Sequence, residues 1–245
     1  MEATVERRLL VNYRVDPHVI APLLPEPLRP QLVDGWAVAG ICLIRLGQLR
    51  PRGFPRRLGL SSENAAHRIA VEWDGGGGVR TGVFIPRRDS NSIATVMLGG
   101  RVFPGAHHFA RFTTGEANGT LSVAFASRDE SARAAVMVEP VADLPESALF
   151  SSTESASRFF ERGSSGYSTA RRPDQLDGLM LTTKKWHVEA ARVVSARSSF
   201  FEDERLFPRG SATLDCALLM REVPVEWHTL ASLSIVPSRL GLSRV

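Results

Sequence analysis

The chain has 245 residues, of which 43% are hydrophobic and 23% charged, enough apolar material for the core of a globular protein. Its formal net charge is only +4, although the sequence pI is about 9.7, and its basic residues are interspersed with acidic ones along the chain. Because a nucleic-acid surface needs basic residues gathered on one face, this pattern argues against nucleic-acid binding.

The N-terminal segment MEATVERRLL lacks the basic-then-apolar order of a signal peptide. No apolar run approaches the ~20 residues that span a bilayer. Cys42 and Cys216 each lie in an apolar run, which is typical of buried reduced thiols rather than of a disulfide or a metal pair. We therefore expect a cytoplasmic protein without membrane partners. We also expect a single domain over residues 1–245, because nothing in the middle of the sequence resembles a linker.

Strands and turns dominate the first part of the chain. Arg7 to Val15 alternates as a first strand, and Asp16-Pro17 starts a short helix, because an acidic cap followed by Pro favours helix initiation. Pro25 ends that helix. Asp34-Gly35 then predicts a tight turn into a strand from Trp36 to Leu49.

A glycine run, Gly75 to Gly78, separates two predicted strands, Arg68 to Trp73 and Arg80 to Ile85. A phosphate loop needs a helix after its glycines and usually a Lys-Ser/Thr pair, whereas here a strand follows. The glycines are therefore interpreted as a flexible hairpin turn.

The densest group of Arg, Asp, Asn and His lies between Gly82 and Phe112. Apolar residues at 93, 96 and 97 have the spacing of one helical face, so a short helix is predicted there. A strand is predicted from Ala106 to Phe112, in which His107 and His108 face opposite ways.

The second half continues the alternation of strands with short helices. A hairpin is predicted from 121–126 and 134–138, and a helix from Pro145 through Phe160. Two long strands follow, Leu179 to Val194 and Ala212 to Met220.

So many antiparallel strands predict an α+β protein. Because closure removes exposed edges, we expect a curved or closed antiparallel β-barrel or cone with a few short flanking helices. Its pocket would lie in the barrel mouth. The tail, 229–245, is expected to pack loosely.

Five segments in this order resemble the YqjF-like family of uncharacterised proteins, which is related in fold to acetoacetate decarboxylase. They are VDGWAVAGICLIRL, the Ser-Glu-Asn at 62–64, GVFIPRRDSNS, GGRVFPGAHH and MREVPVEWH. The resemblance extends from about Val5 to His228. It implies a cone-like antiparallel barrel around a small-molecule pocket, and no settled reaction.

The resemblance also implies a test of mechanism. Acetoacetate decarboxylases form a Schiff base through a lysine whose pKa an adjacent lysine lowers. Their motif, a glycine-arginine segment followed by Gly-x-Pro-Lys-Lys, is matched here by Gly100 to His108, which contains no lysine. Decarboxylation by the usual route is therefore not expected. Lys184 and Lys185 are candidates for a substitute pair, one of which would face inward in a strand. The alternative is that both are solvated near a strand end.

His107 and His108 are the stronger catalytic candidates, because histidine transfers protons near neutral pH. The alternative is a histidine satisfied by a backbone carbonyl or a carboxylate. Glu63 matches the place where the decarboxylase family carries a pocket carboxylate, with a strand-start cap as the alternative. No HxH or HExxH spacing supports a metal site, so neither metal nor cofactor is expected.

Arg68, Arg87 and Arg88 are candidates for binding a substrate carboxylate through a bidentate fork. For Arg87 and Arg88 the alternative is a local surface ion pair with Asp89. Arg101, in the glycine-arginine segment that the resemblance matches, is a further ligand-binding candidate.

Three functions remain open from the sequence. The first is a lysine-independent enzyme, lyase-like or isomerase-like, acting on a small carbonyl or carboxylate compound. The second is a non-catalytic small-molecule-binding protein with the same barrel, and the third is a protein-interaction module. The substrate and any homo-oligomerisation also stay open.

Overall fold

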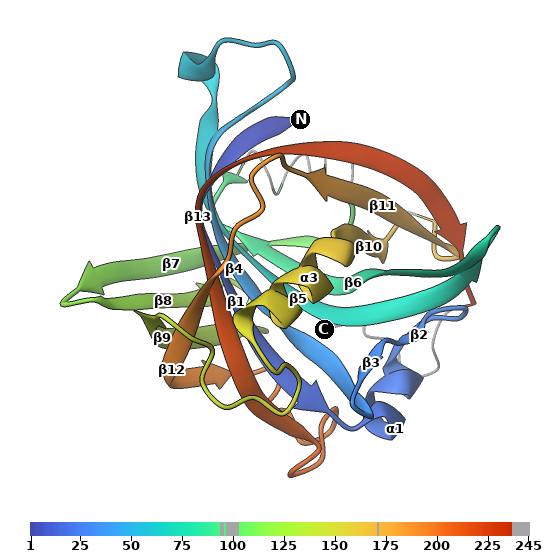
Figure 1. Cartoon of the computed structure of the whole chain (residues 1–245). Coiled ribbons are helices and arrows are strands. Elements are labelled where there is room, and N and C mark those ends of the chain that lie inside the picture. The colour runs from blue at the N-terminus through green and yellow to red at the C-terminus, as the bar shows by residue number, and fades with distance from the viewer. Residues whose placement is uncertain (94–95, 97–102, 171, 237–245) are drawn as a thin grey trace.

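The computed structural model describes all residues except 94–95, 97–102, 171 and 237–245 (Figure 1). Its strands are β1 (Glu2–Val15), β2 (Arg29–Pro30), β3 (Leu32–Val33), β4 (Trp36–Arg50), β5 (Leu60–Gly75), β6 (Gly78–Ser90), β7 (His107–Ala117), β8 (Thr120–Ser127), β9 (Arg133–Val141), β10 (Ser165–Thr169), β11 (Gln175–Thr182), β12 (Glu189–Ser198) and β13 (Ala212–Ser234). The α-helices that lie wholly within the described residues are α1 (Pro17–Ile20) and α3 (Thr153–Arg162), beside the single 3-10 turns Ala21–Leu23 and Arg56–Leu58.

The strands form one sheet that closes on itself. Nine strands pair in the circular order β6-β7-β8-β9-β12-β13-β1-β4-β5, and the pairing of β5 with β6 completes the ring. All these pairs are antiparallel except β6 with β7. The predicted α+β fold with a curved and closed, mostly antiparallel sheet is confirmed.

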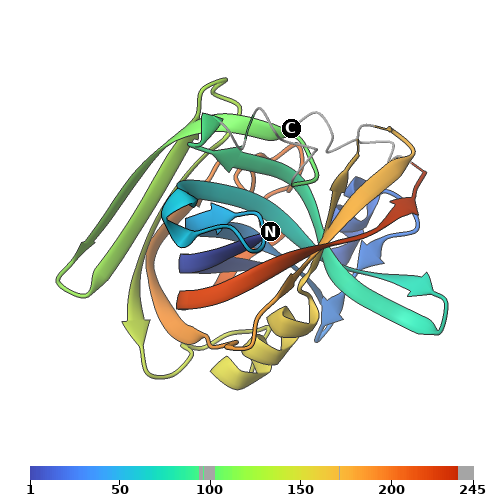
Figure 2. The same cartoon turned by 90° about the horizontal axis from the view of Figure 1, so that it is seen from above.

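Strands β10 and β11 close a second, smaller ring on the same sheet. Strand β10 pairs in parallel with β6, and β11 pairs antiparallel with both β10 and β13. The seven strands β6, β10, β11, β13, β1, β4 and β5 therefore also form a closed path (Figure 2). The 23-residue strand β13 pairs with β12, β1 and β11 at different points along its length, so it borders both rings.

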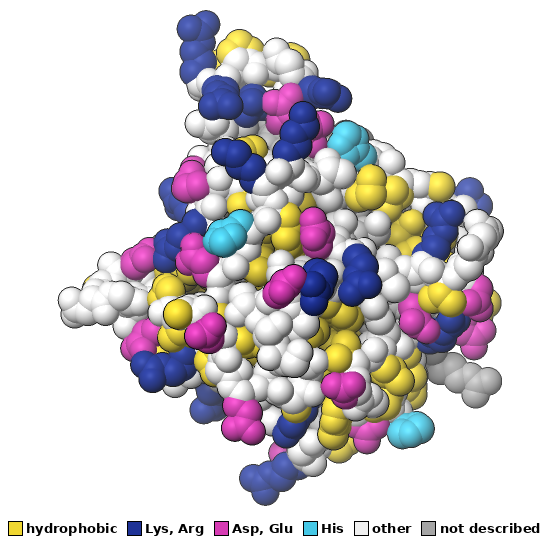
Figure 3. Space-filling model, in the orientation of Figure 1, with side chains coloured by type: hydrophobic (Ala, Val, Ile, Leu, Met, Phe, Trp, Pro, Cys, Tyr) yellow, Lys and Arg dark blue, Asp and Glu magenta, His cyan; other side chains and the backbone are white. Residues whose placement is uncertain are grey.

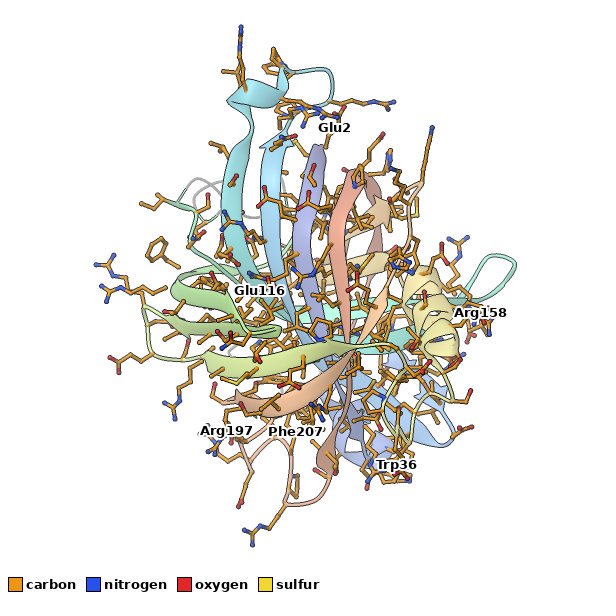
Figure 4. The ribbon with its side chains drawn as sticks, turned by 60° about the vertical axis from the view of Figure 1, so that its left-hand side comes forward. Glu2, Trp36, Glu116, Arg158, Arg197 and Phe207 are labelled. Atoms are coloured by element: carbon orange, nitrogen blue, oxygen red, sulfur yellow. The ribbon has the colours of Figure 1, made fainter. Side chains whose placement is uncertain are left out.

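The two rings share the strands β13, β1, β4, β5 and β6, and the first four of these lie side by side as a wall (Figure 4). Alternate side chains of a strand point to opposite faces. Leu9 and Val11 accordingly join the main apolar core of the nine-strand ring, whereas Leu10 packs on the other face in the cluster that includes Phe160 of α3. A register shift between Val5 and Arg7 changes this alternation near the start of β1.

The turn chemistry read from the sequence is largely confirmed. Asp16 caps α1 by accepting a hydrogen bond from the His18 backbone N–H at 2.8 Å, and Pro17 is the first helical residue. Asp34 and Gly35 both have positive φ in the turn between β3 and β4. The glycine run forms the turn between β5 and β6, as predicted.

Several predicted boundaries were wrong, and the strand predicted to end at Met220 continues in β13 to Ser234, where it pairs with β11. The helix starts at Thr153 rather than at Pro145, because Ser152 and Ser155 form a reciprocal capping box there. The strand predicted from Leu179 to Val194 is interrupted between β11 and β12, which pair with different parts of β13. The helix predicted around 93–97 falls largely outside the described residues.

Both cysteines are buried free thiols, as expected. Within the part of the chain that the structure describes, no helix is long and apolar enough to cross a membrane. Acidic and basic side chains are interspersed over the face shown in Figure 3, with apolar groups between them.

Candidate functional site

A cavity of about 130 Å³ lies within the smaller ring, and each of the seven strands of that ring contributes to its lining. Most of the lining is apolar: Val5, Ile44, Leu46, Leu49, Ala65, Ala66, Val83, Ile85, Phe103, Leu179, Leu181 and Trp227. The polar lining residues are Arg8, Cys42, Ser62, Asn64, Arg68, Arg88, Asp89, His107 and Ser164. The cavity therefore combines an apolar wall with three arginines.

Arg68, on β5, is a buried cation with unused donors. Its side chain is held between sheet and helix: Nη2 donates to the Asn12 Oδ1, and the guanidinium carbon lies 4.5 Å from the centroid of the Phe160 ring. Nε and Nη1 are buried and have no hydrogen-bond partner among the described residues. Burial lowers the pKa of Arg68 to about 10, so the group still carries its charge at neutral pH.

A glycine on the neighbouring strand makes room for this arginine. Gly40 pairs with Arg68 across β4 and β5. A Cβ added at Gly40 would lie 3.3 Å from the Arg68 Nη2 and 2.3 Å from the Val11 backbone oxygen. The close approach of Arg68 to the wall therefore depends on the absence of a side chain at position 40.

Arg88 is a second cavity cation, held by neutral acceptors. Its Nε donates to the Pro104 backbone oxygen at 3.0 Å and its Nη2 to the Ser168 Oγ at 3.4 Å. Burial lowers its pKa to about 10. Asp89 also lines the cavity, but its two carboxylate oxygens accept hydrogen bonds from Arg87, each at 2.9 Å.

Arg8 extends from β1 beside the thiol of Cys42. Its Nε lies 3.2 Å from the Cys42 Sγ, and its Nη1 lies 3.8 Å from the Met220 Sδ. Across the described residues, no ion pair joins Arg8, Arg68 or Arg88 to a carboxylate. The cavity wall thus carries uncompensated positive charge.

The parallel pairing of β6 with β7 decides which histidine faces the cavity. His107 is paired with Arg88, and His108 with Asp89. His107 lines the cavity, with its Nε2 3.2 Å from the Phe103 backbone oxygen, and burial followed by the charge of Arg88 lowers its pKa to about 4. His107 is therefore neutral at physiological pH.

His108 points away from the cavity. Its Nδ1 lies 2.8 Å from the Asp129 Oδ2, in the turn between β8 and β9. Arg87 also lies on that face: it is almost fully buried, it is bound by Asp89, and its Nη2 lies 3.5 Å from the Asp129 Oδ1.

Glu63 lies between two cavity-lining residues, Ser62 and Asn64, but does not line the cavity itself. Its carboxylate accepts from Arg7 at 2.5 Å and from Arg45 at 3.2 Å. The strand alternation therefore directs this carboxylate to the face opposite the cavity, where two cations compensate it.

Neither lysine approaches the cavity. Lys184 and Lys185 are exposed in the connection between β11 and β12, and the sequence contains no other lysine. Arg101 lies outside the described residues. No group of three or more His, Cys, Asp or Glu side chains could hold a metal ion within the described part of the chain.

Several polar lining residues were missed in the sequence, among them Asn64, Cys42 and Arg8. Asn64 was noted only within a motif, Cys42 was interpreted as core, and Arg8 was not singled out. Cross-strand pairing brings Arg8 and Asn64 together, since Ile44 is the partner of both, and Cys42 lies two residues before Ile44 on β4. The alternation of β1 could have pointed to Arg8, because Arg8 lies two residues before the core residue Leu10 and therefore on the same face of the strand. The sequence does not show, however, which face borders a cavity.

Comparison with solved structures supports the fold assignment. Acetoacetate decarboxylase from Legionella pneumophila subsp. pneumophila str. Philadelphia 1 is similar to this chain with a TM-score of 0.57 at 14% identity, covering 98% of this chain and 88% of that one. The enduracididine biosynthesis enzyme MppR, complexed with the condensation product of pyruvate and imidazole 4-carboxaldehyde, gives a TM-score of 0.57 at 16% identity, covering 95% and 88%. An acetoacetate decarboxylase-like enzyme from Sphingomonas wittichii RW1 gives 0.55 at 14% identity, covering 95% and 93%.

At these identities the likeness establishes the fold alone. No curated protein matches the sequence significantly. The family model of DUF2071, described as an uncharacterized conserved protein, matches residues 2–224. This match confirms the resemblance to YqjF-like proteins and covers most of the chain, which therefore belongs to the DUF2071 family of uncharacterized conserved proteins.

Proposed function

We propose that this protein binds a small carboxylate compound with an apolar part inside the smaller ring, without Schiff-base chemistry. The observation that carries this proposal is Arg68, a buried cation whose Nε and Nη1 have no partner among the described residues. An uncompensated buried charge is costly unless it is paired and hydrogen-bonded. A ligand carboxylate supplies both the charge and the acceptors that Arg68 lacks.

The rest of the cavity sets the size and polarity of the ligand. Arg88 offers a second positive charge, and the apolar lining suits a hydrocarbon or carbonyl part. A volume of about 130 Å³ is close to the ~150 Å³ cavity that accepts benzene. We therefore expect a compound of about six to eight non-hydrogen atoms.

The positions of the lysines argue against the usual decarboxylase route. A Schiff base needs a lysine amine at the substrate carbonyl. Lys184 and Lys185 are both exposed and outside the cavity lining, and no further lysine occurs in the sequence. Among similar structures, MppR was solved with pyruvate, a small oxo acid, which is consistent with a carboxylate or carbonyl ligand here.

Acid–base catalysis is the second candidate function, and it rests on His107. A neutral imidazole beside the cavity is able to accept a proton from a bound ligand, although a pKa of about 4 makes it a weak base. If His107 takes no part in turnover, the protein is a non-catalytic binder with the same cavity. The interaction-module hypothesis would be supported by a large exposed apolar patch. It has less support, because charged side chains are interspersed with the apolar groups on the face shown in Figure 3.

Calorimetry with butyrate and butyramide, a charged and a neutral compound of similar shape, tests the proposal. We expect butyrate to bind and butyramide to bind at least about tenfold more weakly, because a charge-assisted hydrogen bond contributes about 1.5–3 kcal/mol. Arg68→Gln should weaken butyrate binding by a similar factor. Arg111→Gln is the matched control, since Arg111 is exposed and outside this cavity lining.

Equal affinity for butyrate and butyramide, or unchanged butyrate binding in Arg68→Gln, would overturn the proposal. Arg88→Gln gives an independent variant if Arg68→Gln folds poorly. Comparing turnover of any bound oxo acid in the wild type and in His107→Gln then separates an enzyme from a binder.

A further inference from the structure

Cys42 is a side chain with nucleophilic chemistry that lines the cavity. It lies on β4, is 3% exposed, and faces the cavity between its strand partners Leu10 and Ala66. Arg8 donates from Nε to its Sγ at 3.2 Å. The thiol is therefore placed at the cavity surface and is held by a cation.

Two further cations act on the same sulfur. The charges of Arg68 and Arg88 both interact electrostatically with Cys42. Cys42 thus shares the cavity wall with three arginines.

The other cysteine provides an internal comparison. Cys216 is also buried, but it does not line the cavity, and its Sγ accepts a hydrogen bond from the Asn12 Nδ2 at 3.4 Å. Burial raises the pKa of Cys216 to about 12, so it remains a thiol. Of the two cysteines, only Cys42 combines a cavity position with arginine neighbours.

The unpartnered Nε and Nη1 of Arg68 point independently to an anionic ligand in the same cavity. We propose that Cys42 is a nucleophile that adds reversibly to the carbonyl carbon of a small oxo acid whose carboxylate is bound by Arg68 and Arg88. This inference rests on the proposed function and narrows its ligand class from carboxylates to oxo acids.

The addition is balanced without another reagent. The sulfur–carbon bond forms while the π bond of the carbonyl breaks, and the thiol proton ends on the carbonyl oxygen. The product is a hemithioketal, and loss of the thiol restores the ligand. This route provides covalent activation of a carbonyl in a cavity without a lysine.

Alkylation by iodoacetate and by iodoacetamide, followed by intact mass, tests the reactivity of Cys42. Each reagent forms a carbon–sulfur bond with loss of iodide, but only iodoacetate carries the carboxylate that the arginines would bind. We expect iodoacetate to label Cys42 about tenfold faster, relative to the same two reagents on a free thiol, because a cavity of opposite charge concentrates an anion. Cys42→Ser should lose the label and Cys216→Ser should keep it.

Carbon NMR of pyruvate labelled with ¹³C at the carbonyl tests the covalent step. In the wild type and in Cys216→Ser, part of the signal of bound pyruvate should move from the shift of a carbonyl carbon to that of a tetrahedral carbon. In Cys42→Ser it should not.

In the alkylation experiment, the Arg68→Gln variant should lose the preference for iodoacetate while retaining its reaction with iodoacetamide.

The outcomes separate the two proposals. If butyrate and pyruvate bind but Cys42 shows neither the iodoacetate preference nor a tetrahedral adduct, the nucleophile inference is wrong and carboxylate binding stands. If no carboxylate binds, both are wrong, even where iodoacetamide still labels Cys42.

Discussion

His67 is a buried titratable residue on the face of β5 opposite the cavity. Its ring is fully buried, its centroid lies 4.7 Å from that of Phe200, and neither ring nitrogen has a partner among the described residues. Burial, with a further contribution from the charge of Arg87, lowers its pKa from 6.5 to about 3. His67 is thus neutral in the folded protein over the pH range in which it is charged in the unfolded chain.

This difference predicts acid sensitivity. Because the folded-state pKa lies below the unfolded value, the stabilising contribution of neutral His67 is complete above about pH 6.5 and is lost as the pH falls towards 3. Each pH unit in that window costs up to about 1.4 kcal/mol. In His67→Gln, urea unfolding between pH 6.5 and 4.5 should show a slope of unfolding free energy against pH that is shallower by about that amount.

The control for this prediction is His18→Gln, because His18 is exposed. It should leave the pH dependence unchanged. If the slope of unfolding free energy against pH in His67→Gln equals that of the wild type, His67 takes up its proton without unfolding.

The adjacent arginines Arg87 and Arg88 show that residue type alone does not decide the environment of a side chain. Arg87 and Arg88 were both ligand candidates, yet Arg88 lines the cavity and Arg87 is bound by Asp89 on the other face. The ion pair with Asp89 therefore forms at Arg87, where it is buried rather than at the surface, and Arg88 remains a ligand candidate. Only the pairing of β6 with β5 and β7 fixes which residue takes which environment.

At the scale of elements, α3 is the helix that supports the cavity. It carries Phe160, whose ring packs against the Arg68 guanidinium, and Gly163 and Ser164 after its end line the cavity. Its start is fixed by Ser152, which accepts from the Ser155 backbone N–H at 3.1 Å, while the Ser155 hydroxyl oxygen accepts from the Ser152 N–H at 3.1 Å.

Removal of the cap should therefore weaken α3. Ser152→Ala is expected to lower the free energy of unfolding by about 1 kcal/mol, because it leaves backbone donors of the first turn without an acceptor. Urea unfolding measures the global change, and amide hydrogen exchange in α3 localises it. Ser151→Ala is the matched control at an exposed position outside the cap; an equal effect of the two variants would argue against the capping role.

At the scale of the whole molecule, the cavity depends on closure of the smaller ring. The contact between β6 and β10 is short, with Val83 paired to Gly166 and Phe84 to Tyr167. Gly82 lies beside this contact: a Cβ there would come 2.6 Å from the Ser165 backbone oxygen and 3.3 Å from the Trp73 ring. The absence of a side chain at Gly82 lets β10 approach β6.

Gly82→Ala should push these strands apart. We expect a loss of about 1–3 kcal/mol in the free energy of unfolding, as for other overpacked sites, and weaker butyrate binding in calorimetry. Gly76→Ala, where no atom lies within 4 Å of an added Cβ, should change stability by less than about 0.5 kcal/mol. Wild-type stability and affinity in Gly82→Ala would show that the ring tolerates a wider β6–β10 spacing.

The sequence by itself determined the strand-rich composition, the turns at Asp34-Gly35 and at the glycine run, and the absence of lysine from the segment between Gly100 and His108. These features are local or compositional, so they follow from backbone preferences and residue type alone. Together they favoured a curved or closed antiparallel fold. The missing lysines, compared with the decarboxylase motif that the family resemblance implies, led to the expectation of chemistry without a Schiff base.

Only the tertiary structure decided which polar side chains meet. The register shifts between Val5 and Arg7 in β1 and between His67 and Ile69 in β5 set the face of each following residue. A shift of one residue exchanges the two faces of a strand, and the sequence pattern does not fix where such shifts occur. Strand alternation on the paired sheet places Glu63 away from the cavity, whereas Cys42, which the sequence presents as a core residue, lies within it.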